Sequence, residues 1–148
     1  MTKKYKKIAF VCEGNTCRSA MAQFVMRSKL KEKGETGYKI FSFGLRVGKG
    51  SINENASAAL KAAGYRLAKF VPKPFDGRSA ALFDALITMT YEQKNYLKGY
   101  DNVYCVDELC KTGEIADPYG RDEAFYKKTL FKIEDCCDII IKLLEELK

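Results

Sequence analysis

Short apolar runs alternate with segments of helical periodicity along this chain. Four of the runs have the length and the aliphatic or aromatic content of buried strands, and we expect strands at residues 7–12, 38–43, 85–90 and 102–106. Between and after these runs, the pattern favours helices. We predict them over residues 19–33, 53–63, 91–98 and 122–147.

Strands that alternate with helices are joined by crossover connections, which produce a parallel sheet covered by helices on both faces. We therefore predict an α/β fold with a four-stranded parallel sheet, formed by a single domain over residues 1–148. In folds of this kind the ligand site lies beyond the carboxyl ends of the strands. The first such end in this chain is Cys12.

The absence of histidine restricts the chemistry that the chain can perform. Without histidine there is no Ser-His-Asp or Cys-His arrangement and no histidine-ligated metal site. The six cysteines include no Cys-x-x-Cys pair, the spacing that is typical of zinc sites. We expect catalysis to depend on Cys, Asp, Glu, Lys, Arg and Tyr, with no metal and no cofactor.

The formal net charge of +7 suits anionic substrates, but the cations are not gathered in a stripe with aromatic residues. We expect a basic, solvated surface and no nucleic-acid interface. No apolar run approaches the ~18–20 residues that a membrane span needs, so no membrane partner is expected. The basic first residues lack a signal-peptide core, which predicts a cytoplasmic protein. We also expect the protein to be a monomer or a weak dimer.

The segment from Cys12 to Ser19 carries the strongest chemical signal. It reads Cys-Glu-Gly-Asn-Thr-Cys-Arg-Ser, and Cys12 ends a predicted strand while Arg18 opens a predicted helix. Gly14 and Asn15 lie in the turn between them, where a positive φ angle is tolerated. We call residues 12–18 the 12–18 loop.

A loop of this length can turn its backbone N–H groups inward as an anion-binding nest. The positive end of the following helix dipole points to the same place, and both effects stabilise a thiolate. Cys12 is therefore expected to be nucleophilic near neutral pH. The planar guanidinium of Arg18 can hold two phosphoryl oxygens, and the Ser19 hydroxyl can hydrogen-bond to the Cys12 sulfur.

Displacement at phosphorus also needs a proton donor for the leaving group, and Asp117 is the best candidate. It lies in a loop after the fourth predicted strand, so it can reach the same sheet edge as Cys12. Pro118 restricts the backbone of Asp117, and Tyr119 offers a flat wall for a substrate ring.

The motif Val-Cys-x-Gly-Asn-x-Cys-Arg-Ser at residues 11–19, with Asp-Pro-Tyr at residues 117–119, resembles the low-molecular-weight protein tyrosine phosphatase family. The resemblance implies the phosphotyrosine-phosphatase I-like fold, with strand order 2-1-3-4. It implies that Cys12 attacks phosphorus while Asp117 protonates the leaving oxygen, and that Asp117 then activates water to hydrolyse the cysteinyl-phosphate. It also implies that Asn15 holds the loop in shape and that Cys17 can form a reversible disulfide with Cys12.

The resemblance thus predicts an enzyme that hydrolyses phosphotyrosine in proteins, as well as aryl phosphates, and that binds phosphate and other oxyanions. The expected catalytic residues are Cys12, Arg18 and Asp117. The expected substrate-binding residues are Glu13, Gly14, Asn15, Thr16, Cys17, Ser19 and Tyr119.

Three positions depart from the family pattern. Glu13 places a negative charge at the rim of the anion site, where relatives often carry an apolar or small residue. Phe70 stands in the segment where the family often has a histidine that orients the loop asparagine, so Asn15 needs another partner, for which Ser42 is a candidate. Thr16 replaces a larger aliphatic residue and resembles the protein-arginine phosphatases of the family. Phosphoarginine is therefore an alternative substrate, with Glu13 pairing to its guanidinium.

Two other functions also use parts of this pattern. Thiol-dependent arsenate reductases resemble this loop, but they need two further cysteines after the third strand. Residues 89–98 contain none, and Cys105 and Cys110 come later with a different spacing. A phosphopeptide-binding module would not need Cys12 and Asp117 together.

Residues 44–51 are similar to a nucleotide-binding P-loop. They have one residue too few between the glycines, and Gly50 occupies the Ser/Thr position. We interpret this segment, the 44–51 loop, as a mobile loop at the mouth of the site. Arg46 or Lys49 can meet acidic residues of a substrate there.

Overall fold

In a computed structural model of the chain, which describes residues 6–147, four parallel strands form one sheet. The strands are β1 (Lys7–Cys12), β2 (Lys39–Gly44), β3 (Ala85–Thr88) and β4 (Val103–Cys105). They lie in the order β2-β1-β3-β4, and every neighbouring pair is parallel. The predicted α/β fold and its strand order 2-1-3-4 are confirmed.

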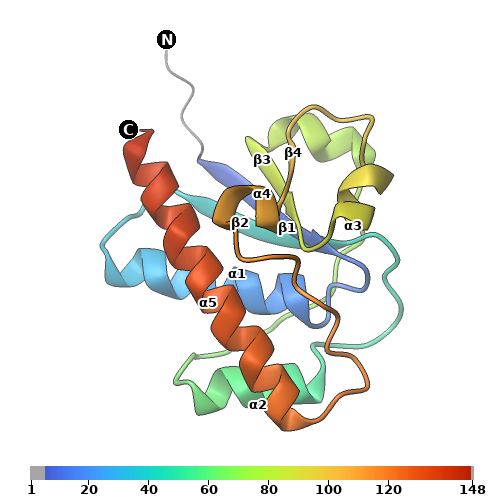
Figure 1. Cartoon of the computed structure of the whole chain (residues 1–148), viewed down its shortest axis with the longest axis vertical. Helices are drawn as coiled ribbons and strands as arrows, with labels where there is room; N and C mark the ends of the chain where they lie inside the picture. Colours follow the sequence, from blue (N-terminus) through green and yellow to red (C-terminus); the bar gives the residue numbers. More distant parts are fainter. Residues whose placement is uncertain (1–5, 148) are drawn as a thin grey trace.

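Five α-helices and one 3-10 helix surround the sheet in the described part of the chain. The α-helices are α1 (Arg18–Glu32), α2 (Glu54–Ala62), α3 (Tyr91–Tyr96), α4 (Val106–Cys110) and α5 (Glu123–Glu146). The 3-10 helix is η1 (Gly77–Leu82). Figure 1 shows α1, α2 and α5 packed next to one another on one face of the sheet.

The apolar pattern does not predict α4 or η1. α4 has only 5 residues, and its first residue, Val106, continues the apolar run of β4. The helix begins there because the Glu108 side chain accepts a hydrogen bond from the Cys105 N–H at 2.8 Å. η1 begins in a similar way, since the Asp76 carboxylate accepts a bond from the Arg78 N–H at 2.9 Å.

β3 ends at Thr88, before the predicted boundary at residue 90. Thr90 and Gln93 form a capping box at the start of α3. The Gln93 side chain also accepts a hydrogen bond from the Met89 N–H at 2.9 Å. These bonds commit the backbone of residues 89 and 90 to the helix start, and so the strand stops earlier.

Apolar side chains pack on both faces of the sheet. Ile8 and Phe10 of β1 pack on one face with buried residues of α1, α2, α4 and α5. Ala9 and Val11 pack on the other face with residues of η1 and with Leu97 at the end of α3. Because β1 is buried on both sides, its sequence is a continuous apolar run instead of an alternating one.

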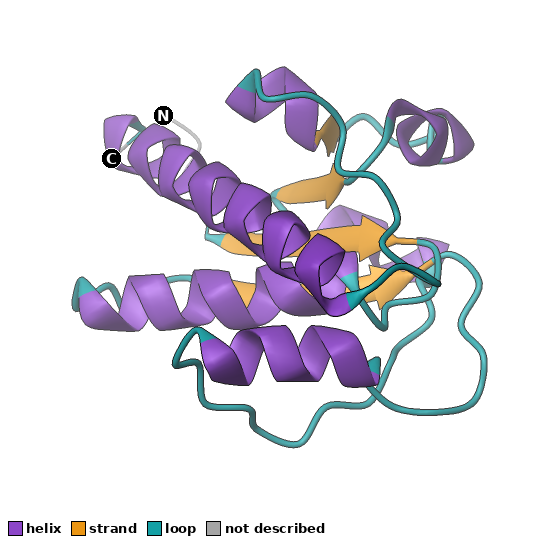
Figure 2. Cartoon of the chain, turned by 60° about the horizontal axis from the view of Figure 1, so that its bottom comes forward, coloured by secondary structure: helices purple, strands orange, loops and turns teal. Residues whose placement is uncertain are grey.

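All four strands point the same way, so the loops that follow them gather at one edge. Figure 2 shows the arrowheads of the strands and these loops on the same side of the molecule. Cys12 lies at this edge as the last residue of β1, and the segment that joins α4 to α5 reaches the same place. This arrangement positions the candidate site.

At the opposite edge, where the strands begin, lies an apolar cavity of about 280 Å³. It is lined by Ile8 at the start of β1, by Leu109 of α4, by Ile140 of α5 and by Leu147 after the end of α5. The start of β1 and the end of α5 are therefore neighbours at the edge of the sheet away from Cys12.

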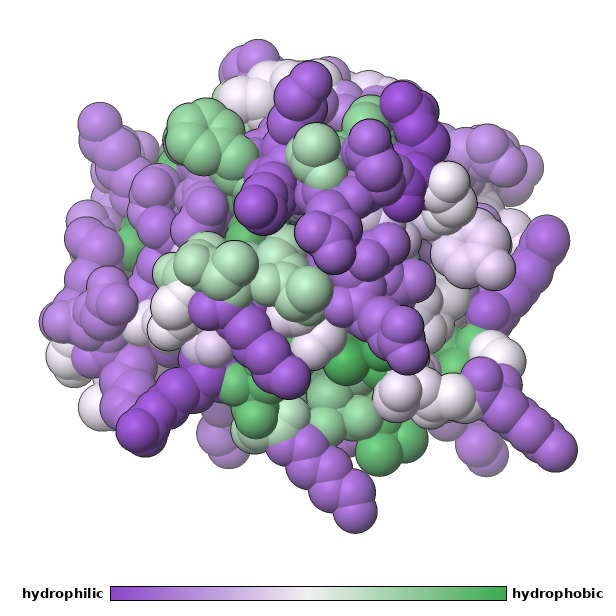
Figure 3. Space-filling model, turned by 90° about the horizontal axis from the view of Figure 1, so that it is seen from below, coloured by the Kyte–Doolittle hydropathy of each residue, from purple (hydrophilic) through white to green (hydrophobic). Residues whose placement is uncertain are grey.

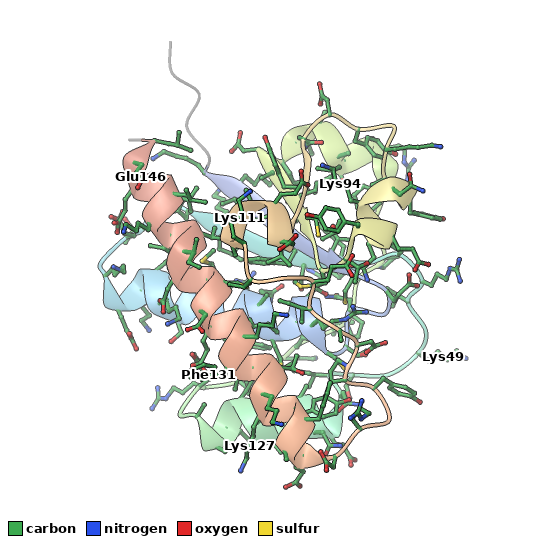
Figure 4. All side chains as sticks on the ribbon, in the orientation of Figure 1. Lys49, Lys94, Lys111, Lys127, Phe131 and Glu146 are labelled. Carbon is green, nitrogen blue, oxygen red and sulfur yellow. The ribbon has the colours of Figure 1, made fainter. Side chains whose placement is uncertain are left out.

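The outer surface carries many charged side chains. Hydrophilic residues dominate the face in Figure 3, and apolar residues show there in smaller areas between them. Phe131, which Figure 4 labels on α5, is one of the few large apolar side chains that are well exposed. No helix within residues 6–147 has the length and apolar character required to cross a membrane.

Candidate active site

The 12–18 loop turns tightly between β1 and α1, as predicted. Cys12 is the last residue of β1 and Arg18 is the first residue of α1. Between them, Asn15 has a φ angle of 57°, in the left-handed region that asparagine tolerates better than most residues. The positive φ expected in the turn is thus found at Asn15.

Several carbonyl groups of the loop point away from its centre. The Cys12 carbonyl accepts a hydrogen bond from the Leu45 N–H at 2.9 Å, and the Thr16 carbonyl accepts one from the Asn53 N–H at 2.9 Å. Because the C=O and N–H of a trans peptide unit point in opposite directions, the N–H groups that follow these carbonyls turn inward. Inward N–H groups of this kind form a concave surface that suits an anion.

The N-terminus of α1 adds to this donor surface. Cys17 is the N-cap residue, and its side chain makes no capping hydrogen bond. The first N–H groups of α1 therefore lack the side-chain acceptor that a Ser, Thr, Asp or Asn cap supplies. Together with the helix dipole, they favour negative charge at the mouth of the loop.

Asn15 stabilises the loop from behind, because its side chain is fully buried. Its Nδ2 donates to Ser19 Oγ at 2.8 Å, and its Oδ1 accepts from the Lys73 N–H at 2.9 Å. The expected partner Ser42 is wrong, since Ser42 Oγ donates to Gln23 Oε1 at 2.6 Å. The amide of Asn15 is thus satisfied by a hydroxyl and a backbone group.

Phe70 does not take the role of the histidine that the resemblance led us to expect in this segment. Its ring packs on Phe24 of α1, with the ring centroids 5.7 Å apart. The segment instead orients Asn15 through the backbone of Lys73, which needs no particular side chain at that position.

The Ser19 hydroxyl lies beside the sulfur of Cys12. The distance from Ser19 Oγ to Cys12 Sγ is 2.9 Å. Asn15 already donates a hydrogen to Ser19 Oγ, so the hydroxyl keeps its own hydrogen as a donor. It can direct that hydrogen to Cys12 Sγ or, at 3.4 Å, to the carbonyl of Phe43. The predicted contact between Ser19 and Cys12 is present.

Arg18 links the loop to the segment that carries Asp117. The guanidinium is almost fully buried, and its Nη1 donates to the Ile115 carbonyl at 3.0 Å. Its Nη2 lies 3.7 Å from Asp117 Oδ2, while about half of the Asp117 side chain is exposed. Asp117 Oδ1 also accepts a bond from the Tyr119 N–H at 3.1 Å. The carboxylate therefore lies next to the guanidinium, and it lines the same cavity as Cys12.

These groups surround a cavity of about 250 Å³. Eight of the ten predicted site residues line it, and Asn15 and Ser19 lie behind the loop that forms its floor. Arg46 lines the mouth as well, whereas Lys49 does not. The lining consists of Cys12, Glu13, Gly14, Thr16, Cys17, Arg18, Arg46, Asp117 and Tyr119.

Cys17 is held in a different way from Cys12. Its sulfur lies 3.6 Å from the hydroxyl of Tyr126 in α5. Burial raises the pKa of the Cys17 thiol, and burial together with the bond to Cys17 raises the pKa of Tyr126 as well. Both groups therefore stay protonated near neutral pH.

Sequence reasoning missed three partners of the site: the Lys73 N–H, the Ile115 carbonyl and the Tyr126 hydroxyl. The first two are backbone groups, which every residue has, and so they leave no signal in the sequence. Tyr126 occurs on the apolar face of a long helix, where an aromatic residue normally indicates only packing.

The arrangement brings the sulfur of Cys12, a buried cation and a carboxylate to one donor-lined cavity. That combination can hold a tetrahedral oxyanion, attack its central atom and transfer a proton. Cys105 and Cys110, the later cysteines of the arsenate reductase alternative, do not line the cavity. Within residues 6–147, no group of three or more His, Cys, Asp or Glu side chains is placed to hold a metal ion.

The fold and this loop define the class as phosphatases with a parallel α/β sheet. The family model described as "Low molecular weight phosphotyrosine protein phosphatase" matches residues 7–148. The chain belongs to this family.

Curated and solved relatives agree with this assignment. The low molecular weight protein-tyrosine-phosphatase PtpA of Staphylococcus aureus is 28% identical, over 91% of this chain and 94% of that protein. Among solved structures, the low molecular weight protein tyrosine phosphatase of T. tengcongensis has a TM-score of 0.86 and 27% identity, covering 93% of this chain and 98% of that one. The YwlE arginine phosphatase of Geobacillus stearothermophilus has a TM-score of 0.84 and 26% identity, covering 95% and 94%.

Proposed function

We propose that this chain is a protein tyrosine phosphatase that hydrolyses phosphotyrosine and aryl phosphates through a cysteinyl-phosphate, with no metal or cofactor. The observation that carries the proposal is the placement of Cys12 Sγ, Arg18 and Asp117 around one cavity of about 250 Å³. We further propose that the whole chain acts as one catalytic domain.

In the first step, the Cys12 thiolate attacks phosphorus and the bond from phosphorus to the tyrosine oxygen breaks. The inward N–H groups of the loop and the guanidinium of Arg18 bind the nonbridging oxygens, whose charge is neutralised as the transition state forms. Arg18 keeps its bond to the Ile115 carbonyl, which fixes the plane of the guanidinium. Asp117 gives its proton to the departing phenolate, and tyrosine is released.

In the second step, Asp117 takes a proton from a water molecule that attacks the cysteinyl-phosphate. The P–S bond breaks, and the sulfur leaves as a thiolate. The Ser19 hydroxyl stabilises that thiolate, because it lies 2.9 Å from Cys12 Sγ and has a hydrogen to donate. Inorganic phosphate then leaves, and the enzyme returns to its starting state.

Two substitutions test the assignment of the nucleophile and the acid. Cys12→Ser is expected to abolish hydrolysis of an aryl phosphate while phosphate binding, measured by calorimetry, persists. Asp117→Asn is expected to lower kcat by about 10²–10⁴-fold, and more for poor leaving groups than for good ones. Cys105→Ala is the matched control, because this buried cysteine does not line the cavity.

Two results would count against the proposal. One is substantial turnover by the Cys12→Ser variant, and the other is loss of wild-type activity in EDTA. Either would point to a different nucleophile or to a metal-dependent reaction.

A second candidate substrate is phosphoarginine, favoured by two residues of the cavity lining. Thr16 is smaller and more polar than the aliphatic residue of many tyrosine-specific relatives, and Glu13 can pair with a guanidinium. YwlE, a structural relative, is described as an arginine phosphatase. The small, polar side chain of Thr16 and the negative charge of Glu13 both support a site that accepts a planar cation next to the phosphoryl group.

Rates on matched phosphotyrosine and phosphoarginine peptides separate the two candidates. If phosphotyrosine is the substrate, wild type prefers that peptide, and Thr16→Ile changes the ratio of kcat/KM values only slightly. If phosphoarginine is the substrate, Thr16→Ile lowers kcat/KM for that peptide by about tenfold or more, and Glu13→Gln lowers it as well. The Glu13→Asp variant, which keeps the charge, is the control.

A further inference from the structure

A further cavity, of about 270 Å³, lies beside β2, the outermost strand of the sheet next to β1. We call it the β2 cavity. Its wall comes from α1, from β2 and from the segment between α2 and η1. It shares no wall residue with the cavity at Cys12. The wall consists of Gln23, Arg27, Phe41, Ser42, Lys69, Phe70, Val71 and Lys73.

Three cations border the β2 cavity, and no carboxylate within residues 6–147 does. The cations are Arg27, Lys69 and Lys73. None of them belongs to an ion pair in the described part of the chain. The positive potential of the cavity is therefore not neutralised by its own wall, and the cavity suits an anion.

Arg27 is already held in place for contact with an anion. Its Nε and its Nη2 both donate to the Ile40 carbonyl, at 3.0 and 2.5 Å, which fixes the plane of the guanidinium. Its Nη1 makes no hydrogen bond to any residue that the structure describes. A guanidinium fixed in this way can offer its remaining N–H groups to an oxyanion with little further loss of side-chain entropy.

Gln23 adds a buried donor to the wall. Only 7% of its surface is exposed, and its Oε1 accepts a hydrogen bond from Ser42 Oγ at 2.6 Å. Its Nε2 has no partner within residues 6–147, yet no fully enclosed side-chain N or O among them lacks one. Nε2 therefore borders open space, and the open space beside Gln23 is the β2 cavity. A buried amide donor without an acceptor indicates that a ligand supplies one.

The rest of the wall is apolar. Phe41 and Phe70 are half-buried, and Val71 is exposed. Phe70 is held by its packing on Phe24, so its ring offers a surface that exists before any ligand binds. A flat apolar group can pack on these side chains while an attached anionic group meets the cations.

We propose that the β2 cavity binds a small aromatic phosphate, at a site separate from the catalytic one. The phosphoryl oxygens accept hydrogen bonds from the amide of Gln23 and from the three cations, and the ring packs on the apolar wall. The described wall has no cysteine, and its one hydroxyl, that of Ser42, already donates to Gln23. The site therefore holds the phosphate without cleaving it, and this inference does not rest on the proposed function.

The test is a titration of the isotope-labelled full-length protein with phenylphosphonate, followed by NMR. Phenylphosphonate carries a ring and an anionic group, and it is not hydrolysed because its phosphorus is bonded to carbon. The side-chain N–H signals of Gln23 and Arg27 report on the β2 cavity, and the backbone N–H of Gly14 reports on the cavity at Cys12. We expect the signals of both cavities to shift and to saturate.

Two substitutions separate the two cavities. Gln23→Glu keeps the acceptor for Ser42 Oγ but replaces the donor Nε2 with a carboxylate oxygen, so it should abolish the response of the Arg27 signal. Lys69→Gln removes one cation from an exposed position and should weaken binding at the β2 cavity by about threefold or more. In both variants the response of Gly14 should persist.

Lys127→Gln is the matched control, because Lys127 is an exposed lysine of α5 (Figure 4) that lines neither cavity. Benzyl alcohol, which has the ring without the charge, should leave the Gln23 and Arg27 signals unmoved. The proposal would be overturned by equal losses in Lys127→Gln and Lys69→Gln, or by shifts that benzyl alcohol or sodium chloride of the same ionic strength reproduces. A Gln23 signal that stays unmoved while Gly14 saturates would overturn it as well.

Discussion

At the scale of single residues, the site depends on side chains that lie behind the 12–18 loop and do not line the cavity. Asn15 is the clearest case, because it holds a left-handed backbone and joins Ser19 to the segment at Lys73. Ser19 depends on it in turn, since the hydrogen that Asn15 donates leaves the Ser19 hydroxyl free to serve the Cys12 sulfur. The surroundings of the Cys12 sulfur are thus set by buried neighbours.

Substitutions of Asn15 separate its two contributions. Asn15→Ala places an alanine at a φ angle of 57°, a conformation that alanine adopts less readily than asparagine. It also leaves the Lys73 N–H without its acceptor. We expect kcat to fall by about 10–100-fold, with a lower melting temperature. Asn15→Gly adopts the same φ without strain but also lacks the acceptor for the Lys73 N–H, so it should recover part of the stability and not kcat. Full recovery of kcat in the glycine variant would show that the hydrogen bonds are dispensable.

At the scale of elements, the shape of the site depends on close packing between two loops that are distant in sequence. Gly44 ends β2 beside the 12–18 loop, and its N–H donates to the Lys73 carbonyl at 2.8 Å. A Cβ at Gly44 would lie 2.8 Å from the Glu13 carbonyl oxygen and 2.9 Å from the Gly14 carbonyl carbon, closer than real Cβ contacts. The absence of a side chain there lets the two loops pack together.

Gly44→Ala is therefore expected to displace the 12–18 loop. The added methyl group meets backbone atoms, which cannot turn away as a side chain can. We therefore expect overpacking to lower the free energy of unfolding by about 1–3 kcal/mol. Activity should fall by about tenfold or more, together with the melting temperature. Gly48→Ala in the same 44–51 loop is the matched control, since a Cβ there meets nothing within 4 Å. Equal effects of the two substitutions would contradict this account.

The sequence predicted the elements that have a strong pattern and missed those that depend on contacts. The central strand, the long helix and the Cys12, Arg18 and Asp117 positions follow from apolar runs, periodicity and motif. α4 and the early end of β3 depend on side chains that bond to nearby backbone, such as Glu108 and Gln93. The partner of Asn15 was mistaken because the competing donor is a backbone group with no residue-specific signal.

At the scale of the whole molecule, stability is linked to the protonation of buried thiols. Burial raises the pKa of Cys17, Cys105 and Cys137 above the ordinary value of 9.0. The unfolded chain releases these protons near the ordinary value, whereas the folded chain keeps them. The stabilising contribution is thus fully present below pH 9 and is lost as the pH rises above it.

The melting temperature is expected to fall by about a few degrees between pH 8.5 and pH 10.5. The measurement is thermal denaturation followed by circular dichroism, with a phosphine reductant present so that no disulfide forms. Cys105→Ala removes one of the titrating groups and should make the decline less steep. A melting temperature that stays flat over this range would show that the buried thiols do not control alkaline stability.

The positions of the start of β1 and the end of α5 have a practical consequence. The start of β1 and the end of α5 meet around the apolar cavity, at the edge of the sheet opposite to Cys12. A fluorophore, affinity tag or solid support attached close to the start of β1 or the end of α5 would therefore lie away from a substrate that enters the cavity at Cys12. An immobilised form of the enzyme can thus present its reactive edge to bulky partners, so that large substrates can be captured on a surface without obstruction by the tether.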